Sequence, residues 1–315
     1  MSRRQILCLS GGGFAGLFAA KFLALLEAQC PDSTNLGTHF DAFAGTSVGG
    51  LIALGLASGS PATEILAILE RYGPAVFPRK RGGFGRMIWH PKHRIAPLRQ
   101  HVTTLLGDRT LHDLTKPVLI PSVSLSSGQP KLFRAIPGRV HSDSQTSLVD
   151  VALATSAAPL YFPPHSIQHD LYADGSVIAN VPDPLAILDA TQRLGWHRDD
   201  LSILSIGTTY VPPGVLTHST AQWGLVKWML HKRKLFAITM IAQMRLSLEI
   251  ARQLVPPERL IRIDPALSPE QAKAIGLDLA HSKASETLQA IAGREVNRLP
   301  PAQLKQLLHH VARDY

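Results

Sequence analysis

The chain has 315 residues, 45% of them hydrophobic and 17% charged, which is the composition of an ordinary globular protein long enough to bury a core without covalent cross-links. Its two cysteines exclude a disulfide framework and a cysteine-rich zinc site, so a reducing cytoplasm is expected. A net charge of +9 favours phosphate-bearing partners, and charge alone does not choose between nucleic acid and an anionic membrane.

The first expected elements are a strand, a glycine loop and a helix. Gln5–Leu9 is an apolar strand too short for a signal-peptide core, and no later apolar run reaches the roughly 18 residues of a membrane-spanning helix. We therefore expect a protein that is neither exported nor inserted into a membrane. After the strand, Gly11, Gly12, Gly13 and Gly16 lead into a helical pattern. Backbone N–H groups of such a loop can cradle a negatively charged oxygen.

The spacing of Gly11, Gly13 and Gly16 also matches the glycine fingerprint of dinucleotide-binding folds. Those folds need an acidic residue at the end of the second strand, about 20 residues further on, to hold the ribose. Here the second strand ends in Gly45-Thr46-Ser47, and Asp41 lies at its start. The sequence therefore disfavours a dinucleotide and favours one shared role for the two glycine-containing loops.

Ser47 lies at a sharp corner where an apolar strand stops and a helix-like run starts. Gly45 and Gly49 flank it and let backbone and substrate approach closely. At a helix N-terminus, backbone N–H groups and the helix dipole favour negative charge, which suits a nucleophile. The pattern G-x-S-x-G also occurs by chance in glycine-rich connections. Neighbouring parallel strands would place the loop at Gly11 to Gly13 beside this serine as an oxyanion hole.

Strands and helices continue to alternate up to residue 210, which predicts a mostly parallel sheet covered on both faces. Asp174 follows a short apolar strand in an Asp-Gly turn with Gly175. The other elements expected here are helices over Ser60-Pro61 to Gly73-Pro74, Ala96–Leu106, Ser147–Ser156 and Pro182–Leu194, a hairpin of Pro117–Val123 and Leu132–Ile136, and a strand over Leu201–Ile206. Ser60 is the expected N-cap of the first of these helices, with Pro61 at its first position.

Helical patterns dominate after residue 210. They comprise a basic amphipathic helix over Gln222–Ile250 that Pro256-Pro257 ends, a last edge strand over Leu260–Ile263, and two terminal helices introduced by Ser268-Pro269 and Leu299-Pro300-Pro301. We therefore expect a catalytic core over residues 1–210 and a mainly helical extension over 211–315, packed on the core as one compact domain.

Two basic segments each allow two interpretations. Phe77–Arg94 mixes cations with bulky apolar residues, which fits a loop at a membrane interface as well as a solvated loop whose aromatic side chains lie in the core. Gln222–Ile250 fits a helix that lies on a membrane or one that packs on the sheet, and packing is the commoner outcome.

Four blocks, in this order, resemble the patatin-like phospholipase family: Gly11-Gly12-Gly13-Phe14-Ala15-Gly16, Gly45-Thr46-Ser47-Val48-Gly49, Ala154-Thr155-Ser156-Ala157-Ala158-Pro159-Leu160-Tyr161-Phe162 and Asp174-Gly175-Ser176. The resemblance implies a three-layer α/β/α fold with a mostly parallel central sheet. It also implies hydrolysis of acyl esters in phospholipids or other lipids, with no metal and no catalytic cofactor.

Carried over by position, the resemblance makes Ser47 the nucleophile, Asp174 the base and the N–H groups of Gly11, Gly12 and Gly13 the oxyanion hole. Supporting roles in the motifs fall to Gly16, Gly45, Gly49 and Gly175. The chain departs from the family at Ala15, where Arg or Lys is common. Any contribution of that cation to the loop or to a lipid phosphate is therefore missing.

The chain also resembles the compact patatin effectors of bacterial anti-phage signalling, which cyclic oligonucleotides activate to degrade the cell's own membrane. This resemblance implies a cyclic di- or oligonucleotide ligand and peripheral contact with anionic phospholipid at the inner membrane face. DNA is not an expected partner, and assembly into a homo-oligomer stays open.

Two other interpretations stay open. A Ser–His–Asp triad could use His165 or His169, although in α/β-hydrolases the histidine follows the acid in the chain. A basic nucleic-acid- or nucleotide-binding protein without esterase activity fits the charge. That interpretation lacks a helix-turn-helix or finger signature and leaves the paired glycine loops unexplained.

Overall fold

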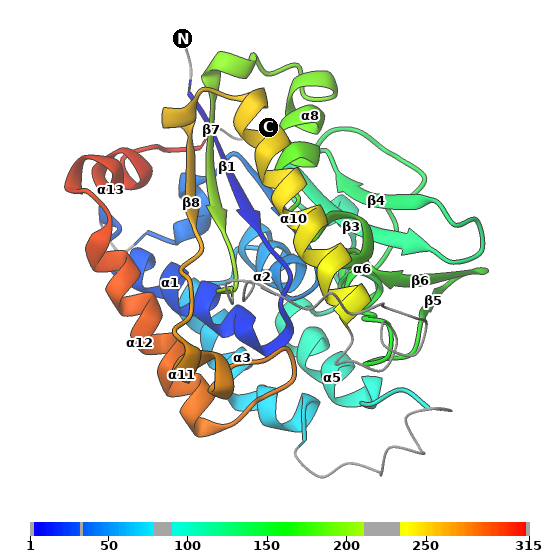
Figure 1. Ribbon diagram of the computed structural model, residues 1–315. Coiled ribbons are helices and arrows are strands. Elements are labelled where there is room, and N and C mark those ends of the chain that lie inside the picture. Colours follow the sequence, from blue (N-terminus) through cyan, green and yellow to red (C-terminus); the bar gives the residue numbers. More distant parts are fainter. Residues whose placement is uncertain (1–2, 32–33, 79–89, 211–233, 313–315) are drawn as a thin grey trace, which may run out of the picture.

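The computed structural model describes residues 3–31, 34–78, 90–210 and 234–312 (Figure 1). The strands are β1 (Arg4–Leu9), β2 (Ala42–Gly45), β3 (Val118–Ser124), β4 (Pro130–Ala135), β5 (His165–Ile167), β6 (Asp170–Asp174), β7 (Leu201–Ile206) and β8 (Leu260–Ile263). The α-helices are α1 (Leu17–Glu27), α2 (Val48–Ala57), α3 (Ala62–Val76), α5 (Ile95–Leu106), α6 (Leu148–Thr155), α7 (Ser176–Ala179), α8 (Asp183–Gln192), α10 (Lys234–Leu254), α11 (Pro269–Ala274), α12 (Ser282–Arg298) and α13 (Pro301–Leu308). Short 3₁₀ helices cover Gly13–Gly16, Leu36–His39, Leu111–Asp113, Arg198–Asp200 and Pro257–Arg259.

The strands form one mixed sheet in the order β5-β6-β3-β2-β1-β7-β8, with β4 also paired to β3. The pairs from β3 through β2, β1 and β7 to β8 are parallel, whereas β4 and β6 run antiparallel to β3, and β5 antiparallel to β6. The chain fills the sheet in one direction from β1 to β3 and in the other direction at β7 and β8. The order therefore reverses at β1, and in open α/β sheets ligands bind beyond the carboxyl ends of the strands at such a point.

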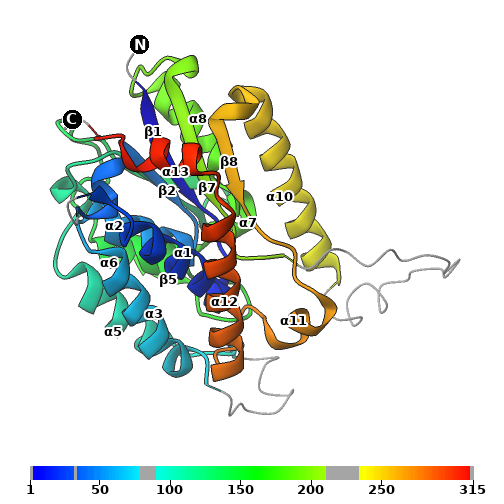
Figure 2. The ribbon, with the colours of Figure 1, turned by 90° about the vertical axis from the view of Figure 1, so that its left-hand side faces the viewer.

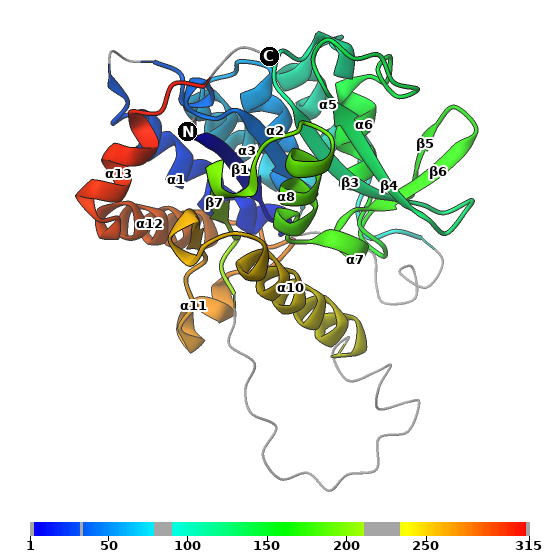
Figure 3. The ribbon, with the colours of Figure 1, turned by 90° about the horizontal axis from the view of Figure 1, so that it is seen from above.

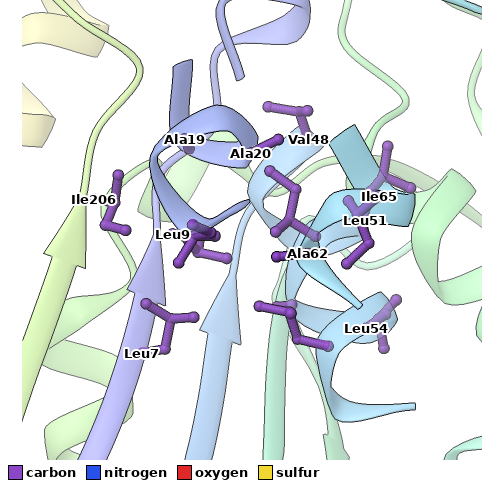
Figure 4. Close-up of a cluster of buried hydrophobic side chains, with 14 of the residues drawn as sticks. Leu7, Leu9, Ala19, Ala20, Val48, Leu51, Leu54, Ala62, Ile65 and Ile206 are labelled. Carbon is purple, nitrogen blue, oxygen red and sulfur yellow. The ribbon is translucent and has the colours of Figure 1, made fainter. Parts of the chain in front are cut away.

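Buried side chains form one cluster on each face of the sheet. Successive strand residues point to opposite faces, so Leu7 and Leu9 of β1 join a cluster with α1, α2, α3, α5, α6 and α12, while Ile6 and Cys8 join one with α8 and α10. Figures 2 and 3 show the sheet between these two groups of helices. In Figure 4, side chains of α1, α2 and α3 pack over β1 and β7. These three layers confirm the predicted α/β/α fold class.

Residues after 233 continue both the sheet and its helical layers. β8 adds a parallel strand beside β7, as the sequence predicts. On one face α12 packs against α1, and on the other α10 packs against α8. The division of the chain into a core and an extension at residue 210 stays a prediction.

Most predicted elements up to residue 210 are present, and three details differ. The helix expected from Ser60 begins at Ala62, and Ser60 makes no capping hydrogen bond. The same helix continues through Gly73-Pro74 to Val76, because a proline in the last turn removes only one backbone hydrogen bond. Asp174 is the last residue of β6, which pairs with the unpredicted short strand β5.

Between β8 and residue 312 the structure has three helices, rather than the predicted two. The missed start is that of α12, whose N-cap is His281: its ring Nδ1 accepts the N–H of Ala284 at 3.0 Å. Histidine is not among the usual capping residues, so the sequence carries no signal for this break. The amphipathic helix ends at Leu254, before Pro256-Pro257.

Parts of both basic segments lie outside the described residues, at 79–89 and 211–233. Of the aromatic side chains in Phe77–Arg94, Phe77 is described. It packs against His93 and Phe162, with ring centroids 5.3 and 5.9 Å away. This contact fits the interpretation in which the aromatic side chains lie in the core. In the parts that are described, no helix is both long enough and apolar enough to cross a membrane.

Candidate active site

Ser47 forms the corner between β2 and α2. Its backbone has φ +55° and ψ −127°, a strained conformation that residues other than glycine rarely adopt. It is the N-cap residue of α2, yet its side chain does not cap the helix. Its N–H donates to the Thr155 hydroxyl at 3.0 Å, and that hydroxyl donates to the Pro121 carbonyl at 2.6 Å. The hydroxyl of Ser47 is therefore left for other chemistry on a backbone that its neighbours fix.

Close backbone contacts leave no room for a side chain at Gly45 or Gly49, the glycines on either side of Ser47. A Cβ on Gly45 would lie 2.2 Å from the carbonyl oxygen of Gly49, and a Cβ on Gly49 would lie 2.4 Å from that of Leu9. Both obstacles are backbone atoms, which no side-chain rotation can remove. The G-x-S-x-G spacing is therefore the steric condition for this turn and for its contact with β1.

Asp174 lies beside Ser47, although 127 positions separate them in the chain. Its carboxyl is 1% exposed, and burial raises its pKa from 3.8 to about 6. Hydrogen bonds from the N–H and hydroxyl of Ser176 and from Ser47 oppose that rise. Gly175 fits directly against β3, because a Cβ there would lie 2.1 Å from the Pro121 carbonyl oxygen. The structure thus brings together the two residues that the sequence selected.

The glycine loop after β1 lies on the other side of Ser47. A Cβ on Gly11 would be 3.2 Å from that of Ser47. The N–H of Gly11 donates to the Asn180 carbonyl at 3.2 Å, so in this conformation it is not available to an oxyanion. The N–H groups of Gly12 and Gly13 have no hydrogen-bond partner among the described residues. The predicted oxyanion hole is therefore reduced to these two donors.

Two side chains hold this loop through the carbonyl of Gly11. The buried Thr208 hydroxyl donates to it at 3.0 Å, and the Asn180 amide donates at 3.4 Å. Gly13 has φ +58°, and a Cβ there would lie 2.3 Å from the Leu277 carbonyl oxygen. The position of the free N–H groups thus depends on residues from three distant parts of the chain.

The remaining family positions contribute to packing. A Cβ on Gly16 would lie 2.5 Å from a methyl carbon of Val48, so its glycine lets the loop approach α2. Ala15, where the family commonly has a cation, is buried in the core cluster with α1.

A pocket opens beside Ser47 and Asp174. It holds about 1260 Å³, including the space open to solvent at its mouth. Its wall is mostly aliphatic and aromatic. It comes from the glycine loop, from α2, α3 and α5, and from the connection after α6; examples are Leu51, Ile68, Val102, Leu105 and Phe162. Such a wall suits a hydrocarbon chain next to a polar reaction centre.

Several residues of the pocket were not selected from the sequence. His101 of α5 lines it and is 6% exposed, and burial lowers the pKa of its imidazole. The hydroxyl of Ser156 also lines it, without a hydrogen-bond partner among the described residues. In the sequence, His101 is one of 14 histidines on an ordinary amphipathic helix, so no local signal distinguishes it.

The histidines of the alternative triad do not line this pocket. The ring of His165 lies 2.9 Å from the Asp150 carboxylate, and His169 borders a separate hollow beside Asp170. Within the described parts of the chain, no group of three or more His, Cys, Asp and Glu side chains could hold a metal ion.

Known proteins resemble this chain over most of its length. Two relatives are both named cGAMP-activated phospholipase. The one from Pseudomonas aeruginosa (strain BWHPSA011 / Pa011) is 34% identical over 295 residues, which cover 90% of this chain and 85% of the relative. The one from Escherichia coli (strain TW11681) is 31% identical over 328 residues, which cover 97% of this chain and 92% of the relative. The superposition on the solved structure of VipD from Legionella pneumophila covers 94% of this chain and 67% of the VipD chain, at 12% sequence identity and a TM-score of 0.42.

The sequence model of one family, the patatin-like phospholipases, matches residues 7–187. That range contains the glycine loop, the serine corner and the buried aspartate. The alignments with the two relatives extend the similarity over most of the chain. The chain therefore belongs to the patatin-like phospholipase family, whose members hydrolyse lipid esters.

Proposed function

We propose that this protein releases fatty acids from membrane phospholipids through a dyad of Ser47 and Asp174. The observation that carries the proposal is the strained Ser47 beside a buried carboxylate, at an apolar pocket. The alternative of a basic nucleic-acid-binding protein without esterase activity does not account for the family membership.

The reaction begins with proton transfer from the Ser47 hydroxyl to the Asp174 carboxylate while the serine oxygen attacks the ester carbon. A free aspartate is too weak a base for this step, and a pKa of about 6 brings Asp174 closer to the working pH. The N–H groups of Gly12 and Gly13 and the N-terminus of α2 stabilise the resulting oxyanion, at roughly 3 to 4 kcal/mol per donor.

The tetrahedral intermediate then collapses. The lysophospholipid leaves as an alcohol, carrying the proton from Asp174, and the acyl group stays on Ser47 as an ester. Water attacks this ester, Asp174 accepts the water's proton, and the fatty acid leaves when the serine oxygen takes the proton back. The acyl chain lies along the apolar wall of the pocket throughout, which holds the ester carbon near the serine.

The test is fatty-acid release from vesicles of anionic phospholipid. Ser47→Ala and Asp174→Ala should each lower the rate at least a thousandfold, whereas His165→Ala and His169→Ala should keep it within about threefold. Full activity of the Asp174 variant would refute the dyad. Loss of activity in a histidine variant that folds normally would restore the triad.

The proposal extends to regulation and place of action. Relatives that cover nine tenths of this chain or more are named as cGAMP-activated, and the net charge of +9 suits a phosphate-bearing ligand. We therefore propose a cytoplasmic effector of anti-phage signalling that a cyclic nucleotide activates to act at the inner face of the membrane. Equal phospholipase rates with and without a panel of cyclic dinucleotides would refute the regulatory part.

A further inference from the structure

Exposed apolar side chains gather around the mouth of the pocket. They come from the connection after α6, from α7, from the N-terminal half of α10 and from the connection between α11 and α12, and we call them the mouth residues: Leu160, Val177, Ile241 and Leu277. Each has more than a third of its surface exposed, and Leu160 is 56% exposed with φ +72°. Single exposed apolar residues are ordinary on protein surfaces, but a group around one opening marks an interaction site.

The pocket lining places these residues at its mouth. Leu277 is itself a lining residue, and Leu160 stands in the chain between two others, Pro159 and Tyr161. Val177 follows the lining residue Ser176 on α7. The N-terminal end of α10 and the connection from α11 to α12 both lie at the end of the sheet toward which β1 and β7 point (Figure 1).

α10 supplies the remaining mouth residue, Ile241, which directly follows Met240, a lining residue of the pocket. Ile238 is exposed as well, but it lies nearly opposite Met240 on the helix. Farther along the helix, Leu246 and Ile250 are also exposed, so the apolar surface continues away from the mouth. The opposite side of α10 packs against the sheet through Ala251. The helix thus buries one side in the protein and presents apolar side chains on the other.

The chemistry of the pocket indicates what covers this surface. An acyl chain that enters a pocket with an apolar wall passes through water unless the rim touches the lipid. Apolar rim side chains inserted at the depth of the acyl chains remove that step. Exposed cations accompany them: Arg94 precedes α5, whose Leu98 lines the pocket, and Arg245 lies on α10. Cations at this position suit anionic head groups.

We propose that the mouth residues form the surface by which this enzyme rests on an anionic phospholipid bilayer, with the pocket opening directly into the lipid. The inference rests on the proposed lipid hydrolysis and adds where and how the enzyme meets its substrate.

The first experiment measures binding to mixed phosphatidylcholine–phosphatidylglycerol vesicles by sedimentation, with and without cGAMP. All variants carry Ser47→Ala, so that the vesicles stay intact. Leu160→Ser and Val177→Ser should each weaken partitioning about tenfold. The matched controls Leu125→Ser and Val140→Ser change exposed residues that neither line nor flank the pocket and should stay within about twofold.

The second experiment keeps Ser47 and compares two substrates. Leu160→Ser and Val177→Ser should lower hydrolysis of vesicle phospholipid about tenfold and leave kcat/KM for a dissolved short-chain ester within about twofold. These measurements distinguish failure of the membrane surface from failure of the proposed function. If the proposed function were wrong, Ser47→Ala would retain hydrolysis of the dissolved ester.

Three outcomes would overturn the proposal. Wild-type protein without affinity for these vesicles, with or without cGAMP, excludes a membrane surface. Equal vesicle binding by mouth variants and controls places the contact elsewhere. Light scattering that shows a wild-type oligomer and a monomeric Leu160→Ser protein assigns the surface to a second copy of the chain.

Discussion

Replacing Asp174 by asparagine should stabilise the folded protein at neutral pH while it abolishes hydrolysis. The carboxyl is 1% exposed, and burial raises its pKa from 3.8 in the unfolded chain to about 6 in the fold. Below about pH 4 the group is protonated in both states and imposes no penalty. As the pH rises, the unfolded chain releases its proton first, so stability falls until the folded carboxyl also ionises near pH 6.

The full penalty above pH 6 is about 3 kcal/mol. An asparagine side chain at this position stays uncharged, so the variant escapes this cost. Its amide still offers an oxygen to the N–H of Ser176 but replaces the other carboxylate oxygen by an NH₂ group. We therefore expect a net gain of about 1 to 3 kcal/mol at pH 8.

The assay is urea unfolding of wild type and Asp174→Asn at pH 5 and pH 8. The advantage of the variant should grow by about 1 kcal/mol between these pH values, since the wild type loses that much. Asp108→Asn, which changes an exposed carboxylate outside the pocket, should alter stability by less than about 0.5 kcal/mol at either pH. A variant no more stable than wild type at pH 8, or an advantage independent of pH, would refute the reasoning.

Three further predictions concern the same site. The kcat/KM for a soluble ester should fall about tenfold for each pH unit below about 6, because only ionised Asp174 accepts the proton; a flat pH–rate profile from pH 4 to 8 would contradict this. Thr208→Val removes a donor to the carbonyl of Gly11 and should lower kcat about tenfold, with KM within about twofold, in steady-state kinetics; an unchanged kcat would show that this bond does not position the loop. Gly49→Ala pushes a Cβ against the backbone of β1 and should cost at least 2 kcal/mol in urea unfolding, whereas Gly293→Ala, with no atom within 4 Å of the added carbon, should be neutral or mildly stabilising.

The sequence predicted the fold class because the parallel part of the sheet is built from short-range signals. Leu201–Ile206 and Leu260–Ile263 were predicted with their observed bounds, since each is an apolar run of strand length. Where a boundary depended on a side chain that only the fold puts in place, the prediction was wrong. Ser60 was expected to cap α3 and does not, and His281 caps α12 without any sequence signal.

The glycine and serine motifs could be recognised in the sequence because the steric requirements of their turns are local. A turn that brings Gly45 against Gly49, and Gly49 against β1, tolerates no side chain at these positions whatever surrounds it. The sequence alone therefore determined the strand–turn–helix at Ser47, the neighbouring glycine loop and, through resemblance, the family of this protein.

Properties that depend on distant contacts were decided by the tertiary structure alone. Burial beneath other elements raises the pKa of Asp174. The N–H of Gly11, one of the three expected oxyanion donors, instead donates a hydrogen bond to the carbonyl of Asn180. The pocket wall likewise comes from helices whose apolar faces look in the sequence like any other core-facing helix. Desolvation, donor availability and cavity shape arise between segments that the chain order keeps apart, and for that reason no single stretch of sequence contains them.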